Sequence, residues 1–385
     1  MNALRDTLHR YVDDGRVPGA VGLLSDGGGT EVVAVGSVDS EGITPMARDS
    51  IFRIASITKP VTAAAVLMLV EEGRLALDAP IDTWLPELAK PSVVRTPDAP
   101  ADDVVPATRP ITVEDLLTSR TGWGFPSNFA LPAVRSLFTV QKDGRALREW
   151  PDQETWLGLL AQVPMLCQPG EAWLYGTSSD LQGILIARAS GRTLSDFLTE
   201  RIFQPLGMKD TAFAVPAAKR HRFTSSYAPA PGGGLELRDS PDGEWCDVPR
   251  FQSGGGGLVS TADDWLAFAR MLLNGGEGNG HRLLTPASVS RMTTDHLTAA
   301  QREKSTLFLD GQGWGYGGQV DVAPTDPWNV PGRYGWVGGT GTTAHLVPST
   351  GTVAILLTQV AMESPAPTPL MRDFWRCAAR LQGAL

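Results

Sequence analysis

The segment RIASITKPVTAAAVLMLVEEG, residues 53–73, places one serine three positions before one lysine at the start of a long apolar run. Residues three apart on a helix share a face, with Cβ atoms about 5–6 Å apart. Pro60 fits only the first turn of a helix, where its missing N–H costs no hydrogen bond, so Ser56 is expected at the helix mouth. The segment predicts a helix that ends near Gly73 and begins either with a serine cap or with a nucleophile one turn from its base, Lys59.

The nucleophile interpretation requires further groups elsewhere in the chain. A neutral lysine can accept a serine proton, but the site also needs a group that protonates the leaving atom and an oxyanion hole. Tyr175, in WLYGTSSDLQG after a Pro-Gly turn, is a candidate for the first. YGWVGGTGTTAHLVP offers Gly338, Gly339 and Gly341 ahead of a strand, where backbone N–H groups can approach a ligand.

Strand patterns lie near both ends of the chain, and helix patterns lie between them. Residues 20–26 and 30–39 flank three glycines and predict a hairpin, and GTTAHLVPSTG and TVAILLTQ predict two late strands. Helices are expected at the N-terminus and over residues 369–381. Residues 85–110, rich in Pro, Asp and Ala, predict a surface loop.

These patterns predict an α/β (α+β) fold. An antiparallel sheet is built from N- and C-terminal segments, flanked by helices, and a mostly helical lobe is inserted. We expect residues 1–81 and 221–385 to form the α/β domain and residues 82–220 to form the inserted helical domain.

The composition excludes several classes of protein. The formal net charge is −9, and no basic run exceeds two residues, so no nucleic-acid partner is expected. No segment is apolar enough for a signal peptide or a membrane span, and three scattered cysteines fit a reducing compartment. We therefore expect a cytoplasmic protein without a membrane partner, although a secreted protein whose leader had been trimmed would look similar.

Other catalytic patterns are missing from the sequence. There is no Gly-x-Ser-x-Gly elbow for a Ser-His-Asp hydrolase, and His345 is the one histidine placed to approach the glycines. No HExxH motif or paired His/Asp cluster occurs, and residues 254–257 are not followed by Gly-Lys-Ser/Thr. No metal and no cofactor is expected.

Three boxes in this order resemble the serine β-lactamase (class C) and penicillin-binding-protein superfamily. They are SITK at residues 56–59, YGT at 175–177 and WVG at 336–338. The phrases ITVEDLLTSRTG, PLGMKDTAF and GGGGLVSTADDWLAFARMLLNGG are similar as well, so the resemblance extends over about residues 51–358. It implies a β-lactamase/transpeptidase-like fold.

The departures from that pattern favour esters over β-lactams. Thr177 replaces the usual Asn of the second box, and Asp180 lies five residues after the tyrosine. Trp336 replaces the Lys or His that helps true β-lactamases hold the substrate carboxylate. This combination is most similar to family VIII carboxylesterases and to related acyltransferases that act on natural-product alcohols.

The resemblance implies a serine hydrolase that cleaves esters with short-to-medium acyl groups. Ser56 would form an acyl-enzyme, with Lys59 and Tyr175 as general base and acid. The N–H groups of Ser56 and Gly339 would form the oxyanion hole, with Thr340 as the alternative to Gly339. The residues expected to bind substrate are Trp336, Gly338, Asp180, Trp123 and Phe125.

Several functions share these residues. An acyltransferase would pass the same acyl group to an alcohol, and a β-lactamase or D-amino-acid peptidase would use the same serine. A catalytically silent binding protein is the non-enzyme alternative. The expected partner is a small-molecule ester or β-lactam, and the sequence does not reveal the oligomeric state.

Overall fold

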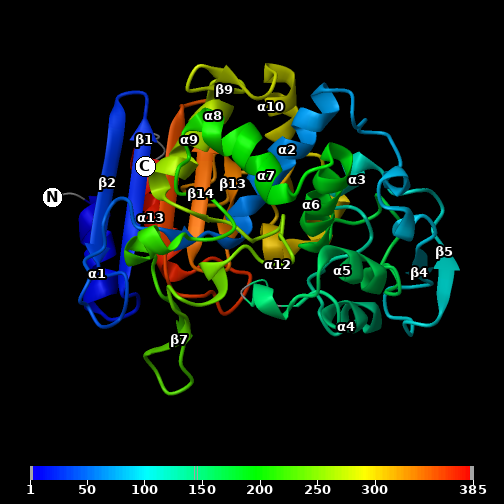
Figure 1. The fold of residues 1–385 in the computed structure, drawn as a ribbon, viewed down its shortest axis with the longest axis horizontal. Coiled ribbons are helices and arrows are strands. Elements are labelled where there is room, and N and C mark those ends of the chain that lie inside the picture. Colours follow the sequence, from blue (N-terminus) through cyan, green and yellow to red (C-terminus); the bar gives the residue numbers. More distant parts are fainter. Residues whose placement is uncertain (1–2, 143, 145, 382–385) are drawn as a thin grey trace.

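A seven-stranded antiparallel sheet forms the centre of the computed structural model, which describes residues 3–142, 144 and 146–381 (Figure 1). The strand order is β11-β12-β13-β14-β15-β1-β2, so the first and last parts of the chain meet in the middle of the sheet. This confirms the expected fold class. The strands are β1 (Gly19–Asp26), β2 (Gly29–Gly36), β11 (Gly313–Trp314), β12 (Gln319–Val320), β13 (Tyr334–Gly338), β14 (Thr342–Val347) and β15 (Thr352–Thr358).

The apolar sequence of β15 explains its central position. Its side chains alternate between two separate hydrophobic clusters: Ile355 and Leu357 face one, while Ala354 and Leu356 face the other. A strand that is apolar on both faces must be covered on both faces. It pairs with β1 in a register that runs from Ala20 opposite Thr358 to Ser25 opposite Val353.

Helices cover both faces of the sheet. On one face α1 (Ala3–Asp13) packs against α13 (Pro369–Leu381), which confirms both predicted terminal helices. On the other face α9 (Ala262–Leu273) packs against β14 and β15. Beyond this layer lies α2 (Lys59–Glu71), which is buried on all sides over residues 59–69 and packs against α6 (Thr177–Ser190).

The middle of the chain is mostly helical and lies on the side of the molecule away from β1 and β2 (Figure 1). Thr112 and Asp115 form a capping box at the start of α3. The limits proposed for an inserted domain, residues 82–220, remain a prediction. The helices of this part are α3 (Val113–Leu117), α4 (Pro132–Phe138), α5 (Gln153–Leu160), α6, α7 (Leu194–Leu198) and α8 (Gln204–Leu206), with a π-turn at Thr199–Phe203.

Residues 85–110 are more ordered than the predicted surface loop. They contain the paired strands β4 (Ser92–Val94) and β5 (Val104–Pro106). Val93 is buried, and the main chain on either side of it exchanges hydrogen bonds with Met165. A short run of β-branched residues that finds a backbone partner becomes a strand despite the flanking prolines, which corrects the loop prediction.

The remaining elements connect the sheet to the helical part. The short strand β3 (Phe52–Arg53), just before Ser56, pairs with β8 (Val259–Ser260), just after the glycine run. No described helix is long and apolar enough to cross a bilayer. The other elements are β6 (Ser226–Pro229), β7 (Leu235–Asp239), β9 (Glu277–Gly278), β10 (His281–Arg282), α10 (Pro286–Met292), α11 (Ala299–Lys304) and α12 (Thr306–Leu309).

The cluster beneath α1 makes a stability prediction. Leu8 belongs to α1, is 0% exposed, and packs between α13 and the sheet. Leu8→Ala should lower the free energy of unfolding by about 2–4 kcal/mol, because it removes buried methyl groups and leaves a cavity. Leu159→Ala is the matched control, since Leu159 is 45% exposed on α5. Denaturant midpoints measure both, and equal shifts for the two variants would contradict the packing described.

Candidate active site

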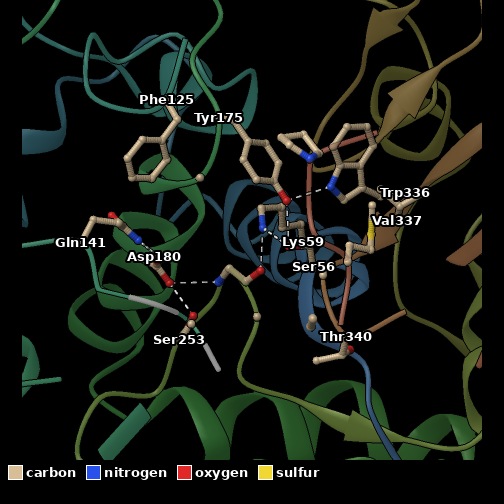
Figure 2. A pocket seen from close by; sticks show the side chains of 18 of the residues that line it. Ser56, Lys59, Phe125, Gln141, Tyr175, Asp180, Ser253, Trp336, Val337 and Thr340 are labelled. Atoms are coloured by element: carbon tan, nitrogen blue, oxygen red, sulfur yellow. Dashed lines mark hydrogen bonds between the residues drawn. The ribbon is translucent and has the colours of Figure 1, made fainter. Parts of the chain in front are cut away.

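A cavity of about 330 Å³ brings the three sequence boxes together (Figure 2). Ser56 and Lys59 reach it from the start of α2, Tyr175 from just before α6, and Trp336 from β13. Residues that are distant in the sequence therefore face one space, and Figure 2 shows Ser56, Lys59 and Tyr175 pointing toward one another.

Ser56 lies in a tight turn that the sheet holds in place. A 3₁₀ turn (Ala55–Thr58) precedes α2, and Ala55 adopts φ 45°, a left-handed conformation that is uncommon for alanine. The preceding carbonyl oxygens accept hydrogen bonds from Thr340 and Thr342, which belong to the β13–β14 hairpin. The hairpin thus stabilises a strained backbone beside the candidate nucleophile.

Two polar groups contact the Ser56 hydroxyl. Lys59 Nζ lies 2.9 Å from Ser56 Oγ, and Tyr175 Oη lies 2.7 Å from the same oxygen. Lys59 is 3% exposed, and its Nζ also donates to the carbonyl oxygen of Gly255 at 2.6 Å. A serine hydroxyl in contact with an amine and a phenol has both partners needed to give up and recover a proton.

Trp336 contacts the Tyr175 hydroxyl, and its position in the sequence did not reveal this contact. Its indole N–H donates to Tyr175 Oη at 2.9 Å. Phe308 stacks on the Tyr175 ring, with centroids 4.7 Å apart. Trp336 therefore supplies a neutral hydrogen-bond donor to the phenol at a place where the superfamily has a cation.

The third box also supplies backbone contacts. Gly339 lines the cavity, and its N–H has no protein acceptor within the described residues. Its carbonyl oxygen accepts from the Met362 N–H at 2.9 Å, which fixes the orientation of this segment. Gly338 lies behind it, where a Cβ would come within 2.5 Å of the Ile54 carbonyl oxygen, so its place is close packing against the nucleophile turn.

Asp180 faces the cavity from α6 but is 3% exposed. Burial raises the pKa of its carboxyl above the ordinary value, while hydrogen bonds from Ser253 and Gln141 and the charge of Lys59 act in the opposite direction. Figure 2 shows these hydrogen bonds to the left of the Ser56 and Lys59 pair.

The two aromatic residues expected near the substrate differ in position. Phe125 lines the cavity, and its main chain exchanges two hydrogen bonds with that of Tyr175. Trp123 is 2% exposed in the core, and its indole N–H donates to the Val163 carbonyl oxygen. Trp123 is absent from the cavity lining, which corrects the expectation that it contacts a substrate.

Several cavity residues were not foreseen. Gln141, Ser253 and Phe308 line the cavity, yet no local sequence pattern marks them. No local pattern links the glycine run that contains Gly255 to Lys59, because their contact depends on the tertiary fold.

The histidine alternative lacks support in this geometry. His345 lies on β14 and is 4% exposed, and its ring contacts Thr343 and Trp375. Burial and the nearby Arg333 hold the pKa of His345 well below its ordinary value. No histidine is among the described residues that line the Ser56 cavity.

Known proteins match this chain over most of its length. The Beta-lactamase family matches residues 4–372. The chain is 38% identical over 337 residues to Protein Rv1367c of Mycobacterium tuberculosis, covering 86% of this chain and 82% of that protein. It is 31% identical over 375 residues to esterase EstB of Burkholderia gladioli, covering 90% and 87%.

A solved structure agrees with the fold. EstCE1, described as a hydrolase with promiscuous acyltransferase activity, has a TM-score of 0.81 and 24% identity, covering 98% of this chain and 97% of that one. The resemblance inferred from the three boxes is confirmed, and the chain belongs to the beta-lactamase family, within the superfamily of serine β-lactamases and penicillin-binding proteins.

Proposed function

We propose that this protein is a serine carboxylesterase of the family VIII type that cleaves esters with short-to-medium acyl groups. The observation that carries the proposal is the double contact at Ser56 Oγ, from Lys59 Nζ at 2.9 Å and from Tyr175 Oη at 2.7 Å. The similarity to esterase EstB supports an ester as the substrate.

Acylation uses the serine and its two partners. Ser56 Oγ attacks the ester carbonyl carbon while its proton passes to neutral Lys59, either directly or through Tyr175. The carbonyl oxygen becomes an oxyanion that accepts hydrogen bonds from the backbone N–H groups of Ser56 and Gly339. The carbon–oxygen bond to the alcohol then breaks, and the leaving oxygen takes a proton from Tyr175 or Lys59.

Deacylation repeats these steps with water. A water molecule attacks the acyl carbon, gives its proton to the same pair, and Ser56 recovers its hydrogen as the acid leaves.

The same acyl-enzyme could pass its acyl group to an alcohol. EstCE1 is described as a hydrolase with acyltransferase activity, so acyl transfer to a natural-product alcohol is the second candidate function.

The walls of the cavity favour an apolar acyl group. Phe125 and Phe308 line it, and Phe129 and Phe138 extend the aromatic surface outward, with centroid distances between 4.8 and 6.2 Å. Phe129 is 38% exposed and Phe138 45% exposed, so both present free ring surface. Contact with these rings stabilises each added methylene of an acyl chain by up to about 0.8 kcal/mol.

The other functions fit less well. Trp336 provides no positive charge for the carboxylate of a β-lactam or of a peptide, so weak β-lactamase or D-amino-acid peptidase activity is at most secondary. A silent binding protein would not need Lys59 and Tyr175 in contact with the same serine oxygen. Covalent labelling of Ser56 by a fluorophosphonate separates a binding protein from an enzyme.

Ser56→Ala should lower kcat/KM for p-nitrophenyl acetate, butyrate and hexanoate by at least about 10³-fold, because it removes the nucleophile. The wild-type enzyme should turn over nitrocefin much more slowly than these esters. Ser288→Ala on α10 is the control and should retain wild-type rates. Full ester turnover by Ser56→Ala would refute the mechanism, and dominant nitrocefin turnover would favour the β-lactamase.

Trp336→Phe should lower kcat/KM for p-nitrophenyl acetate by about tenfold, since it removes the N–H donated to Tyr175 but keeps an aromatic ring. Trp328→Phe, in the cluster on the far face of the sheet, is the matched control. Unchanged kinetics in Trp336→Phe would mean that the indole N–H has no part in the reaction.

The combined change Phe129→Ser and Phe138→Ser should reduce kcat/KM for p-nitrophenyl hexanoate by about tenfold and leave the acetate value nearly unchanged, because only the longer chain reaches the outer rings. Steady-state rates over the acetate-to-hexanoate series measure this. An equal loss for all esters would contradict a role in chain-length preference.

A further inference from the structure

Asp180 accepts hydrogen bonds on both of its carboxylate oxygens. Gln141 Nε2 donates to Oδ2 at 2.8 Å, and Ser253 Oγ donates to Oδ1 at 2.6 Å. The Gly255 N–H donates to Oδ1 at 3.1 Å. These three hydrogen bonds, together with the nearby Lys59, favour the charged carboxylate and oppose the effect of burial, which raises the pKa of Asp180.

Gly255 links this carboxylate to the candidate base. Its N–H donates to Asp180, and its carbonyl oxygen accepts from Lys59 Nζ at 2.6 Å. A Cβ on Gly255 would lie 3.1 Å from Asp180 Oδ1, and a Cβ on Gly254 would lie 2.4 Å from the Ser179 carbonyl oxygen. The absence of side chains in the glycine run therefore lets its backbone lie directly against α6, between Asp180 and Lys59.

We propose that Asp180 is a positioning residue for acyl transfer at Ser56: it fixes Gly255 so that the Gly255 carbonyl oxygen holds Lys59 on Ser56 Oγ, and its charge stabilises the Lys59 ammonium. The inference rests on the proposed function, because it assigns Asp180 a part in the same reaction. It also replaces the expectation that Asp180 binds substrate, since its oxygens already have protein partners.

The negative charge of Asp180 matters at the step in which Lys59 accepts the Ser56 proton. When Ser56 Oγ bonds to the acyl carbon, its O–H bond breaks and the proton arrives on Lys59 Nζ, which becomes an ammonium. A buried positive charge needs a nearby anion, and Asp180 is the carboxylate on the adjoining wall. When the leaving oxygen takes a proton, Lys59 returns to the neutral amine.

Other charged groups line the same cavity, and one of them already has a buried partner. Arg53, on β3, is paired with Asp239, on β7. The titratable and charged side chains that line the cavity are Arg53, Lys59, Lys142, Tyr175, Asp180 and Glu363.

Asp180→Asn tests both parts of the proposal. We expect kcat for p-nitrophenyl acetate to fall by about 10²-fold through loss of positioning, with KM nearly unchanged because Asp180 does not touch the substrate. The substitution also removes the negative charge beside the group that accepts the Ser56 proton. The acidic limb of the kcat/KM profile should therefore move to lower pH.

Asp264→Asn is the matched control. Asp264 is also a buried carboxylate on a helix, where it accepts from the Asp210 N–H and from Thr211 Oγ1, and it is not part of the cavity lining. Its substitution should lower the melting temperature and leave the pH profile unchanged. If the acidic limb of the kcat/KM profile moved equally in both variants, the cause would be a general loss of folding and not the loss of Lys59 positioning by Asp180. That result would overturn the proposal.

Gly255→Ala gives an independent variant, and it carries the test if Asp180→Asn fails to fold. Its Cβ would lie 3.1 Å from Asp180 Oδ1, so the carboxylate must shift by a few tenths of an ångström while the charge is kept. We expect kcat to fall and the acidic limb to stay near its wild-type position. Wild-type kcat in Gly255→Ala, a wild-type pH profile in Asp180→Asn, or a rise in KM alone would each refute positioning. Failure of the proposed function appears separately, as ester turnover that survives Ser56→Ala.

Discussion

The burial of α2 on every side is the constraint on which the rest of the molecule depends. The helix is apolar around its whole circumference, so one covering layer cannot remove it from water. α6 packs along one side and α10 also contacts it, within a large apolar cluster that includes residues of the sheet and of α9. The cavity opens at the N-terminal end of this helix, and the residues that begin α2 and α6 meet there.

This arrangement also explains how a strained turn persists at Ser56. The left-handed Ala55 is fixed on one side by the start of a completely buried helix and on the other by threonine hydroxyls from the β13–β14 hairpin. A conformation of this kind costs on the order of 1–3 kcal/mol and survives where surrounding contacts outweigh it. The threonines that follow the third box therefore stabilise the turn that presents the nucleophile.

The sequence predicted most of the features that local chemistry determines. The terminal helices and strands β14 and β15 follow from short patterns of apolar residues. Strand β13 was not foreseen because its sequence, YGWVG, is interrupted by glycines. Strand β4 was not foreseen because, besides pairing with β5, it bridges to Met165, which is distant in the chain. The residues of the three boxes were found, but the hydrogen bond from Trp336 to Tyr175 and the surroundings of Asp180 depend on contacts between segments that no local pattern encodes.

The order of strands in the sheet has a consequence for folding during synthesis. Ala20 pairs with Thr358, and the hydroxyls that hold the nucleophile turn come from Thr340 and Thr342. During synthesis the N-terminal hairpin and the apolar α2 therefore emerge from the ribosome long before their partners exist. Pairings so distant in the chain form slowly and leave apolar surface uncovered meanwhile. The nucleophile turn can be completed only after β14 has been synthesised, so a chain cut short before β14 would be both inactive and prone to aggregate.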